Sequence, residues 1–283
     1  MIKKIINKFW GTPDKRAMIK KINQLPIASS GIDKENDPFV RLEDGTILYG
    51  KTSNNYNVIF KYLQPKIKEK LNIQCIQVAA DIVIRYVEGG LKYGGPKKQS
   101  RYVVQPGDSV SEMGGYQGFC SVKLAQQVGT KGQVIAIEPM EDNFRLLSKN
   151  KEKNNLTQLK VINRAVWDEA KDVSFERKKG DGQSSSIEMS YDNPDNYIVK
   201  AETLDIIYEK FQMKPLDFMI IQLNGAEINA LRGLTSFKPK QLSIAARYDT
   251  ENQDAAQQIK NHLEKKGYIV EIDEDDFVFA HLS

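Results

Sequence analysis

Short apolar segments alternate with longer amphipathic segments from Gln105 to the end of this chain, and no other feature limits its fold as strongly. Strands that alternate with helices form parallel sheets with helices on both faces. The pattern therefore predicts an α/β fold for this part of the chain. The strand patterns are a short segment ending at Met113 and residues 133–139, 159–166, 173–177, 216–223 and 242–247. The helical patterns are residues 119–128, 141–155, 203–211, 226–231 and 252–266.

The chain closes with two further strand patterns, YIVEI at residues 268–272 and FVFAHL at residues 277–282. Only a short acidic turn, residues 273–276, separates them. A turn this tight joins antiparallel strands, because parallel neighbours need a long crossover connection. At least one of the two closing strands is therefore expected to run against the others, which makes the sheet mixed.

Residues 1–104 follow a different pattern and are expected to form an α+β N-terminal cap on the substrate side, preceding a second domain of residues 105–283. The segment FVRLEDGTILYG, residues 39–50, predicts a hairpin around Asp44-Gly45. Residues 57–91 show a helical pattern that ends at glycines.

The first ten residues, MIKKIINKFW, have an amphipathic helical pattern with lysines opposite an apolar face. Such a helix can make peripheral contact with an anionic membrane, or it can pack on its own domain or a partner. Its short length favours packing.

Composition excludes several classes of function. The net charge is only +4 and no dense basic block occurs, so nucleic acid is not an expected partner. The 2 histidines are too few for most histidine-based chemistry, and no metal site is expected. Cys75 and Cys120 lie among apolar neighbours, which predicts buried free thiols in a cytoplasmic protein. No apolar run is long enough for a transmembrane helix.

A glycine-rich turn, VSEMGGYQGF at residues 110–119, marks the first strand of the α/β part. It matches neither the nicotinamide pattern G-x-G-x-x-G nor the phosphate-binding P-loop. Gly114 and Gly115 allow a sharp turn and a close approach to a ligand, and Gly118 opens the next helix. Glu138 ends the following strand, where a carboxylate can accept hydrogen bonds from ribose hydroxyls. The ligand is therefore expected to contain adenosine.

Glu112, just before the turn, helps to choose between adenosine-containing ligands. A carboxylate at this position repels a pyrophosphate and attracts an ammonium group. S-adenosylmethionine carries an ammonium and a sulfonium but no phosphate, so it is favoured over NAD. A turn with a purely structural role is the alternative, and the two strand-end acids make it the weaker one.

Five segments together resemble the FkbM family of S-adenosylmethionine-dependent methyltransferases. The resemblance extends from about Pro106 to the C-terminus and is strongest at EP-x-x-x-NF and GAE-x-x-x-LRG. It implies a Rossmann-like class I methyltransferase fold with seven strands, helices on both faces and an antiparallel C-terminal edge. It also implies methyl transfer, mostly to hydroxyl oxygen, on small molecules, sugars or natural products. The segments are VSEMGGYQGF, VIAIEPMEDNFRLLSKNKEKNN, VINRAV, KAETLDIIYEK and LDFMIIQLNGAEINALRGL.

The resemblance also implies where the cofactor lies. The methionine end would lie along the glycine turn, the ribose at Glu138, and the adenine beside the residues that end the second and third strands. The cofactor-binding residues implied are Glu112, Gly114, Gly115, Tyr116, Gly118, Glu138, Pro139, Met140, Arg164 and Ala165.

The segment after the fourth strand departs from the family pattern K-x-D-x-E-G-A-E. Gln222 and Asn224 stand where the family has an aspartate and a glutamate, and Glu227 is the acid that remains. These three are the candidate catalytic residues. Amides can hydrogen-bond an acceptor but cannot take its proton at neutral pH. Glu227 lies in the first turn of a helix, so a capping role is as well supported as a catalytic one.

Three functions fit this departure. The enzyme can methylate an O or N acceptor mainly by positioning it. It can methylate an amide nitrogen, for example on a peptide side chain. It can also be a degenerate protein that keeps the fold as a binding module. The Gly/Ser-rich segment 178–186 is either a connection or a lid over the acceptor.

Overall fold

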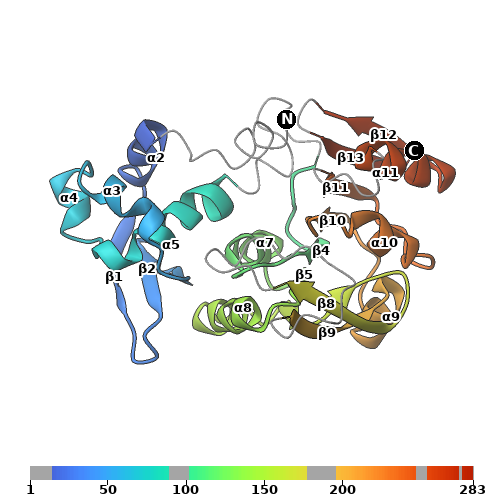
Figure 1. Cartoon of the computed structure of the whole chain (residues 1–283), viewed down its shortest axis with the longest axis horizontal. Coiled ribbons are helices and arrows are strands. Elements are labelled where there is room, and N and C mark those ends of the chain that lie inside the picture. Colours follow the sequence, from blue (N-terminus) through green and yellow to red (C-terminus); the bar gives the residue numbers. More distant parts are fainter. Residues whose placement is uncertain (1–14, 89–101, 177–195, 247–253, 274–275, 283) are drawn as a thin grey trace. The chain divides into compact units, whose positions relative to one another are not determined.

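A computed structural model describes residues 15–88, 102–176, 196–246, 254–273 and 276–282. The chain divides into two compact units, Met1–Gly89 and Gly90–Ser283 (Figure 1). The division into a substrate-side cap of residues 1–104 and a second domain of residues 105–283 stays a prediction. The amphipathic pattern of residues 1–10 and the segment 178–186 lie outside the described residues.

The first unit contains a three-stranded antiparallel sheet in the order β1-β2-β3, preceded by a helix. The strands β2 and β3 form the predicted hairpin, in which the Asp44 side chain accepts a hydrogen bond from the Thr46 N–H at 2.9 Å. The strand β1 is not predicted from sequence, because Ser29, Ser30 and Gly31 in it resemble a loop. These elements are α2 (Lys15–Ile22), β1 (Ile27–Ile32), β2 (Pro38–Leu42) and β3 (Ile47–Tyr49).

Helical segments complete the first unit, but they do not form the continuous helix that residues 57–91 suggest. Proline accounts for one break, since Gln64 precedes Pro65 in an extended conformation. Asn72 starts the next segment by accepting a hydrogen bond from the Gln74 N–H at 2.9 Å. The segments are α3 (Asn57–Phe60), α4 (Pro65–Lys68), the 3-10 helix η2 (Ile73–Cys75), α5 (Ile76–Asp81) and the π-helix η3 (Ile82–Val87).

The turn between β1 and β2 holds an acidic group in the first unit. Carboxylate oxygens of Asp33, Glu35 and Asp37 lie within 4.8 Å of one another. Asp33 accepts hydrogen bonds from the N–H groups of Glu35 at 2.9 Å and Asp37 at 3.0 Å. These hydrogen bonds stabilise the turn, and the turn brings the three carboxylates together.

The second unit is built on a seven-stranded sheet in the order β12-β13-β11-β10-β4-β5-β6. The neighbours from β11 to β6 pair in parallel, whereas β13 runs antiparallel to both β11 and β12. This is the mixed sheet with an antiparallel C-terminal edge that the sequence predicts, and the α/β class is confirmed. The strands are β4 (Ser109–Met113), β5 (Gln133–Ile137), β6 (Leu159–Ile162), β10 (Phe218–Ile221), β11 (Gln241–Ala245), β12 (Tyr268–Ile272) and β13 (Phe277–Leu282).

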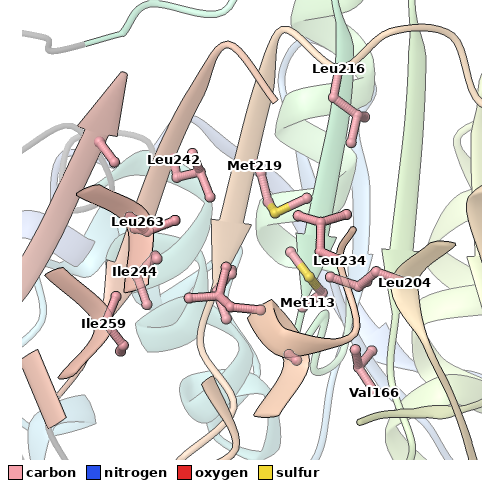
Figure 2. Packing of buried hydrophobic residues seen from close by; sticks show 14 of the residues in the cluster. Met113, Val166, Leu204, Leu216, Met219, Leu234, Leu242, Ile244, Ile259 and Leu263 are labelled. Carbon is pink, nitrogen blue, oxygen red and sulfur yellow. The ribbon is translucent and has the colours of Figure 1, made fainter. Parts of the chain in front are cut away.

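Helices cover both faces of this sheet, as predicted. The helices α9, α10 and α11 contribute to the large apolar cluster on one face, where side chains such as Leu204, Leu234 and Ile259 surround Met113 and Met219 (Figure 2). The helices α7 and α8 pack with β4, β5 and β6 on the other. None of the described helices is long and apolar enough to cross a membrane. The helices are α7 (Phe119–Val128), α8 (Glu141–Lys153), α9 (Leu204–Lys210), α10 (Glu227–Arg232) and α11 (Ala255–Lys265).

A smaller three-stranded sheet, in the order β7-β9-β8, is inserted between β6 and α9. It consists of β7 (Ala165–Val166), β8 (Lys171–Glu176) and β9 (Asn196–Glu202). The single strand predicted at 159–166 is wrong, because the chain leaves the main sheet at Asn163 and Arg164 and enters the small one. The sequence pattern predicts β8 but not β9.

Candidate functional site

The glycine turn follows β4 at the point where the connections of the main sheet change direction. From β4 the chain passes through α7 to β5 on one side, while β10 pairs with β4 on the other. Ligands of open α/β sheets bind beyond the carboxyl ends of the strands at such a point. The sequence and the topology therefore indicate the same place for the site.

Gly114 is required by its backbone conformation and by a close contact across this point. Its φ is +84°, and a Cβ atom built on it would lie 2.1 Å from the carbonyl oxygen of Gln222. The Gln222 N–H donates to the Met113 carbonyl oxygen at 3.0 Å, so the loops after β4 and β10 are held together. Only glycine fits where the two backbones meet.

Gly118 meets a second constraint at the start of α7. Its φ is +86°, and a Cβ atom would lie 2.5 Å from Cδ1 of Leu147 on α8. Between these glycines, Tyr116 has a φ of +50°, an uncommon conformation for a bulky residue. The turn thus combines close packing with backbone strain, which is typical of sites that hold a ligand.

Glu138 fixes this strained turn from the neighbouring strand. Its side chain is buried, and it accepts hydrogen bonds from the N–H groups of Tyr116 at 2.8 Å and Met140 at 3.0 Å. The Asn143 side chain donates to the same carboxylate at 3.4 Å. Glu138 therefore organises the turn that lines the expected cofactor, and its contact with a ribose stays a prediction.

Asn163 is a site residue that the sequence analysis does not identify. Its Nδ2 atom donates to the carbonyl oxygens of Glu138 at 3.0 Å and Pro139 at 2.9 Å, so it holds the end of β5 against the end of β6. Its position directly after β6 is a signal that could have identified it. The neighbouring Arg164 donates to Glu202 in β9 at 3.2 Å. Contact of Arg164 and Ala165 with adenine stays a prediction.

Glu112 lies inside β4, below the turn. It is 2% exposed, and its carboxylate accepts a hydrogen bond from the Ser121 hydroxyl on α7 at 2.5 Å. The structure therefore places this acid close beneath the predicted methionine site. Direct contact with the ammonium group stays a prediction.

Glu227 shapes the loop that follows β10. It is buried, and its two carboxylate oxygens accept hydrogen bonds from the N–H groups of Leu223 and Gly225, both at 2.8 Å. Burial raises the pKa of Glu227, although backbone N–H donors oppose the shift. These contacts support the structural role over the catalytic one.

The same loop carries the two candidate amides. Asn224 has a φ of +53° and Gly225 a φ of +111°, so the backbone turns sharply between Gln222 and α10. Gln222 and Asn224 are both partly exposed at the carboxyl edge of the sheet. Their contact with an acceptor stays a prediction.

Solved structures with a similar fold are methyltransferases of low sequence identity. The fibrillarin of Aeropyrum pernix in complex with natively bound S-adenosyl-L-methionine is 11% identical with a TM-score of 0.43, over 92% of this chain and 100% of that one. A SAM-dependent methyltransferase from Aquifex aeolicus is 16% identical with a TM-score of 0.38, over 71% of this chain and 95% of that one.

Sequence comparison gives the family directly. No curated protein matches the chain in sequence. The family model described as the methyltransferase FkbM domain matches residues 112–270, which span the glycine turn, Glu138, the small sheet and the loop after β10. The chain therefore belongs to the FkbM methyltransferase family, and its cofactor is S-adenosylmethionine, as the motifs predict.

Proposed function

We propose that this protein transfers a methyl group from S-adenosylmethionine to an oxygen or nitrogen acceptor on a small molecule, sugar or natural product in the cytoplasm. The main support is the turn Gly114–Gly118, fixed at the switch point by contacts with both Gln222 and Glu138. Cys75 and Cys120 are buried and form no disulfide, which agrees with a reducing compartment.

The donor set fits this cofactor. The glycine turn and Glu112 would hold the methionine end, and Glu138 would accept hydrogen bonds from the ribose. The adenine would lie beside Pro139, Met140, Arg164 and Ala165. When bound, the cofactor supplies a methyl group activated by its positive sulfonium.

The residues of the chain would then position the acceptor relative to the cofactor. Glu227 holds the loop after β10 through its bonds to the N–H groups of Leu223 and Gly225. The loop presents Gln222 and Asn224, whose amides orient the acceptor by hydrogen bonds. Placing two reactants in a productive geometry removes about 7–11 kcal/mol of barrier in favourable cases. Positioning can therefore supply a large part of the rate enhancement.

A second candidate is methylation of an amide nitrogen, for example on a peptide side chain. Gln222 and Asn224 support it, because paired amides can donate to and accept from the amide of an acceptor. In this function, as in the first, Glu227 is hydrogen-bonded to the backbone and is not placed to act as a base, so the proton released on methylation would pass to solvent.

Calorimetric titration with S-adenosylhomocysteine tests the cofactor site. Glu138 is expected to make the protein prefer this ligand over its 2′,3′-dideoxyribose analogue, and Glu138→Ala is expected to abolish that preference. Glu169→Ala, which changes a side chain that is 67% exposed, is the matched control. A wild-type protein that is folded but binds neither ligand would refute the proposal.

Release of S-adenosylhomocysteine in a screen of hydroxylated metabolites, sugars and short peptides tests the acceptor. Turnover confined to hydroxylated molecules would support the first function, and turnover confined to peptides the second. Gln222→Ala and Asn224→Ala are expected to raise KM for the acceptor while leaving the affinity for S-adenosylhomocysteine unchanged.

A further inference from the structure

Three apolar side chains from separate segments pack on one buried cluster beside the small sheet. Met140 follows β5, Tyr197 lies in β9, and Leu223 follows β10. Each of the three remains partly exposed. The buried members of the cluster are Ala165, Trp167, Val173, Phe175, Val199, Ala201 and Ala226. The small sheet is thus joined by apolar contacts to the carboxyl edge of the main sheet.

One of these residues adjoins the acid expected to bind the ribose, and another follows a residue that contacts the glycine turn. The Met140 N–H donates to Glu138 Oε1 at 3.0 Å, so Met140 is directly beside that carboxylate. Leu223 comes next after Gln222, the residue in contact with Gly114. A base attached to a ribose at Glu138 would therefore lie against this apolar surface.

Tyr197 is held in a defined position within the group. Its hydroxyl donates to Glu141 Oε2 at 3.2 Å, and Glu141 begins α8 directly after Met140. Ile198, the next residue along β9, is 60% exposed, because successive side chains of a strand point to opposite faces. Tyr197 and Ile198 therefore form a matched pair, one facing the cluster and the other facing away.

We propose that Tyr197, together with Met140 and Leu223, forms the wall on which the adenine of S-adenosylmethionine stacks. This inference rests on the proposed function and assigns part of the cofactor site to the inserted small sheet. A purine is flat and largely apolar on its faces, and an aromatic ring and a thioether are suited to pack against it. The hydrogen bond to Glu141 orients the Tyr197 ring for this contact.

Calorimetric titration of wild type, Tyr197→Ala, Tyr197→Phe and Ile198→Ala with S-adenosylhomocysteine tests the wall. Tyr197→Ala is expected to weaken binding by roughly tenfold or more, as for other base–aromatic stacks. Tyr197→Phe keeps the ring and is expected to lose only a few-fold (~2–5) in affinity, the effect of a single hydrogen bond. Ile198→Ala is expected to bind like wild type. Adenosine, which lacks the amino-acid end, should lose the same factor as S-adenosylhomocysteine in Tyr197→Ala.

Unchanged affinity in Tyr197→Ala would overturn the inference, and so would a loss for S-adenosylhomocysteine without one for adenosine. A raised KM for the acceptor with unchanged cofactor affinity would assign the wall to the acceptor instead. If Tyr197→Ala does not fold, Tyr197→Leu replaces it and is expected to bind more weakly than Tyr197→Phe. A wild type that binds no S-adenosylhomocysteine refutes the proposed function itself, whereas the other outcomes refute only the wall.

Discussion

Replacement of Gly114 by alanine should damage the protein in a way that a similar glycine elsewhere does not. Gly114 has a φ of +84°, and a Cβ atom there would be 2.1 Å from the Gln222 carbonyl oxygen. Gly267, which follows α11, has a φ of +90° and nothing within 4 Å of its Cβ position. Both variants bear the cost of a left-handed alanine, but only Gly114→Ala also forces two backbones apart.

The magnitude follows from these distances. A left-handed conformation costs an alanine about 1–2 kcal/mol. The Cβ atom at residue 114 falls 1.3 Å short of ordinary contact, since such contacts begin at 3.4 Å and it would lie at 2.1 Å. Overpacking of this kind adds about 1–3 kcal/mol. We therefore expect Gly114→Ala to lower the free energy of unfolding by about 2–5 kcal/mol, and Gly267→Ala by about 1–2 kcal/mol.

Equilibrium urea unfolding followed by tryptophan fluorescence measures this difference in the second unit. The chain has 2 tryptophans, and Trp167 is buried in the second unit. A Trp10→Phe background makes the fluorescence report on Trp167 alone. Thermal unfolding gives an independent value, with a fall of about 2–4 °C in Tm for each kcal/mol in a unit of this size.

The difference in stability loss between Gly114→Ala and Gly267→Ala tests whether the contact between Gly114 and Gln222 contributes to stability. Equal losses of stability would show that the loop after β10 moves freely away from the turn, and the contact at the switch point would then carry no energy. A larger loss in Gly114→Ala, together with weaker binding of S-adenosylhomocysteine, would show that this contact shapes the cofactor site.

Three further predictions concern polar side chains that form hydrogen bonds with the backbone. Glu227→Ala should lower the free energy of unfolding by about 2–4 kcal/mol, because it leaves two backbone donors without an acceptor; urea unfolding measures the loss, and a loss below about 1 kcal/mol would contradict it. Burial raises the pKa of Asp205, but hydrogen bonds led by Thr235 outweigh it, so the pKa lies below its ordinary value. The stabilisation by Asp205 is therefore present above about pH 4 and lost as the pH falls through the lowered pKa; in urea unfolding, Asp205→Asn should be less stable than wild type at neutral pH and should approach it in acid, and a constant difference would contradict this. Asn163→Ala removes two hydrogen bonds to carbonyl oxygens and should weaken S-adenosylhomocysteine binding by calorimetry, whereas unchanged affinity would show that these bonds do not position Glu138.

The architecture of the second unit could be predicted because the sequence shows both the hydrophobic periodicity of each element and the length of each connection. The closing strands illustrate this: a turn of a few residues permits only an antiparallel pair, and β13 indeed runs against both of its neighbours. The small sheet could not be predicted in the same way. The chain leaves the main sheet at Asn163, whose side chain donates to two carbonyl oxygens just after β5, and the apolar residues Ala165 and Val166 that follow hide this bend in the sequence pattern.

The candidate site was predictable as a place but less so in the roles of its residues. The sequence shows that an acid ends a strand, which suggests a ligand-binding group. It does not show which backbone N–H groups donate hydrogen bonds to that acid. Glu138 and Glu227 show the limit. Each is buried, and each accepts hydrogen bonds from two backbone N–H groups at the carboxyl edge of the sheet. Three of these four donors lie within four residues of their acid, but no sequence pattern marks them, because every residue except proline carries a backbone N–H.

The two acids together imply how such a site can act when amides replace the carboxylates of its family. Two loops must be fixed relative to each other if a donor on one and an acceptor on the other are to meet in line. Glu138 fixes the loop after β4, Glu227 fixes the loop after β10, and the contact of Gly114 with Gln222 joins them. A buried carboxylate that accepts hydrogen bonds from backbone N–H groups makes its loop rigid. Rigid loops favour a methyl transfer whose rate depends on the alignment of donor and acceptor. Under the proposed function, in which Gln222 and Asn224 orient the acceptor, the acceptor itself must then provide a reactive nucleophile.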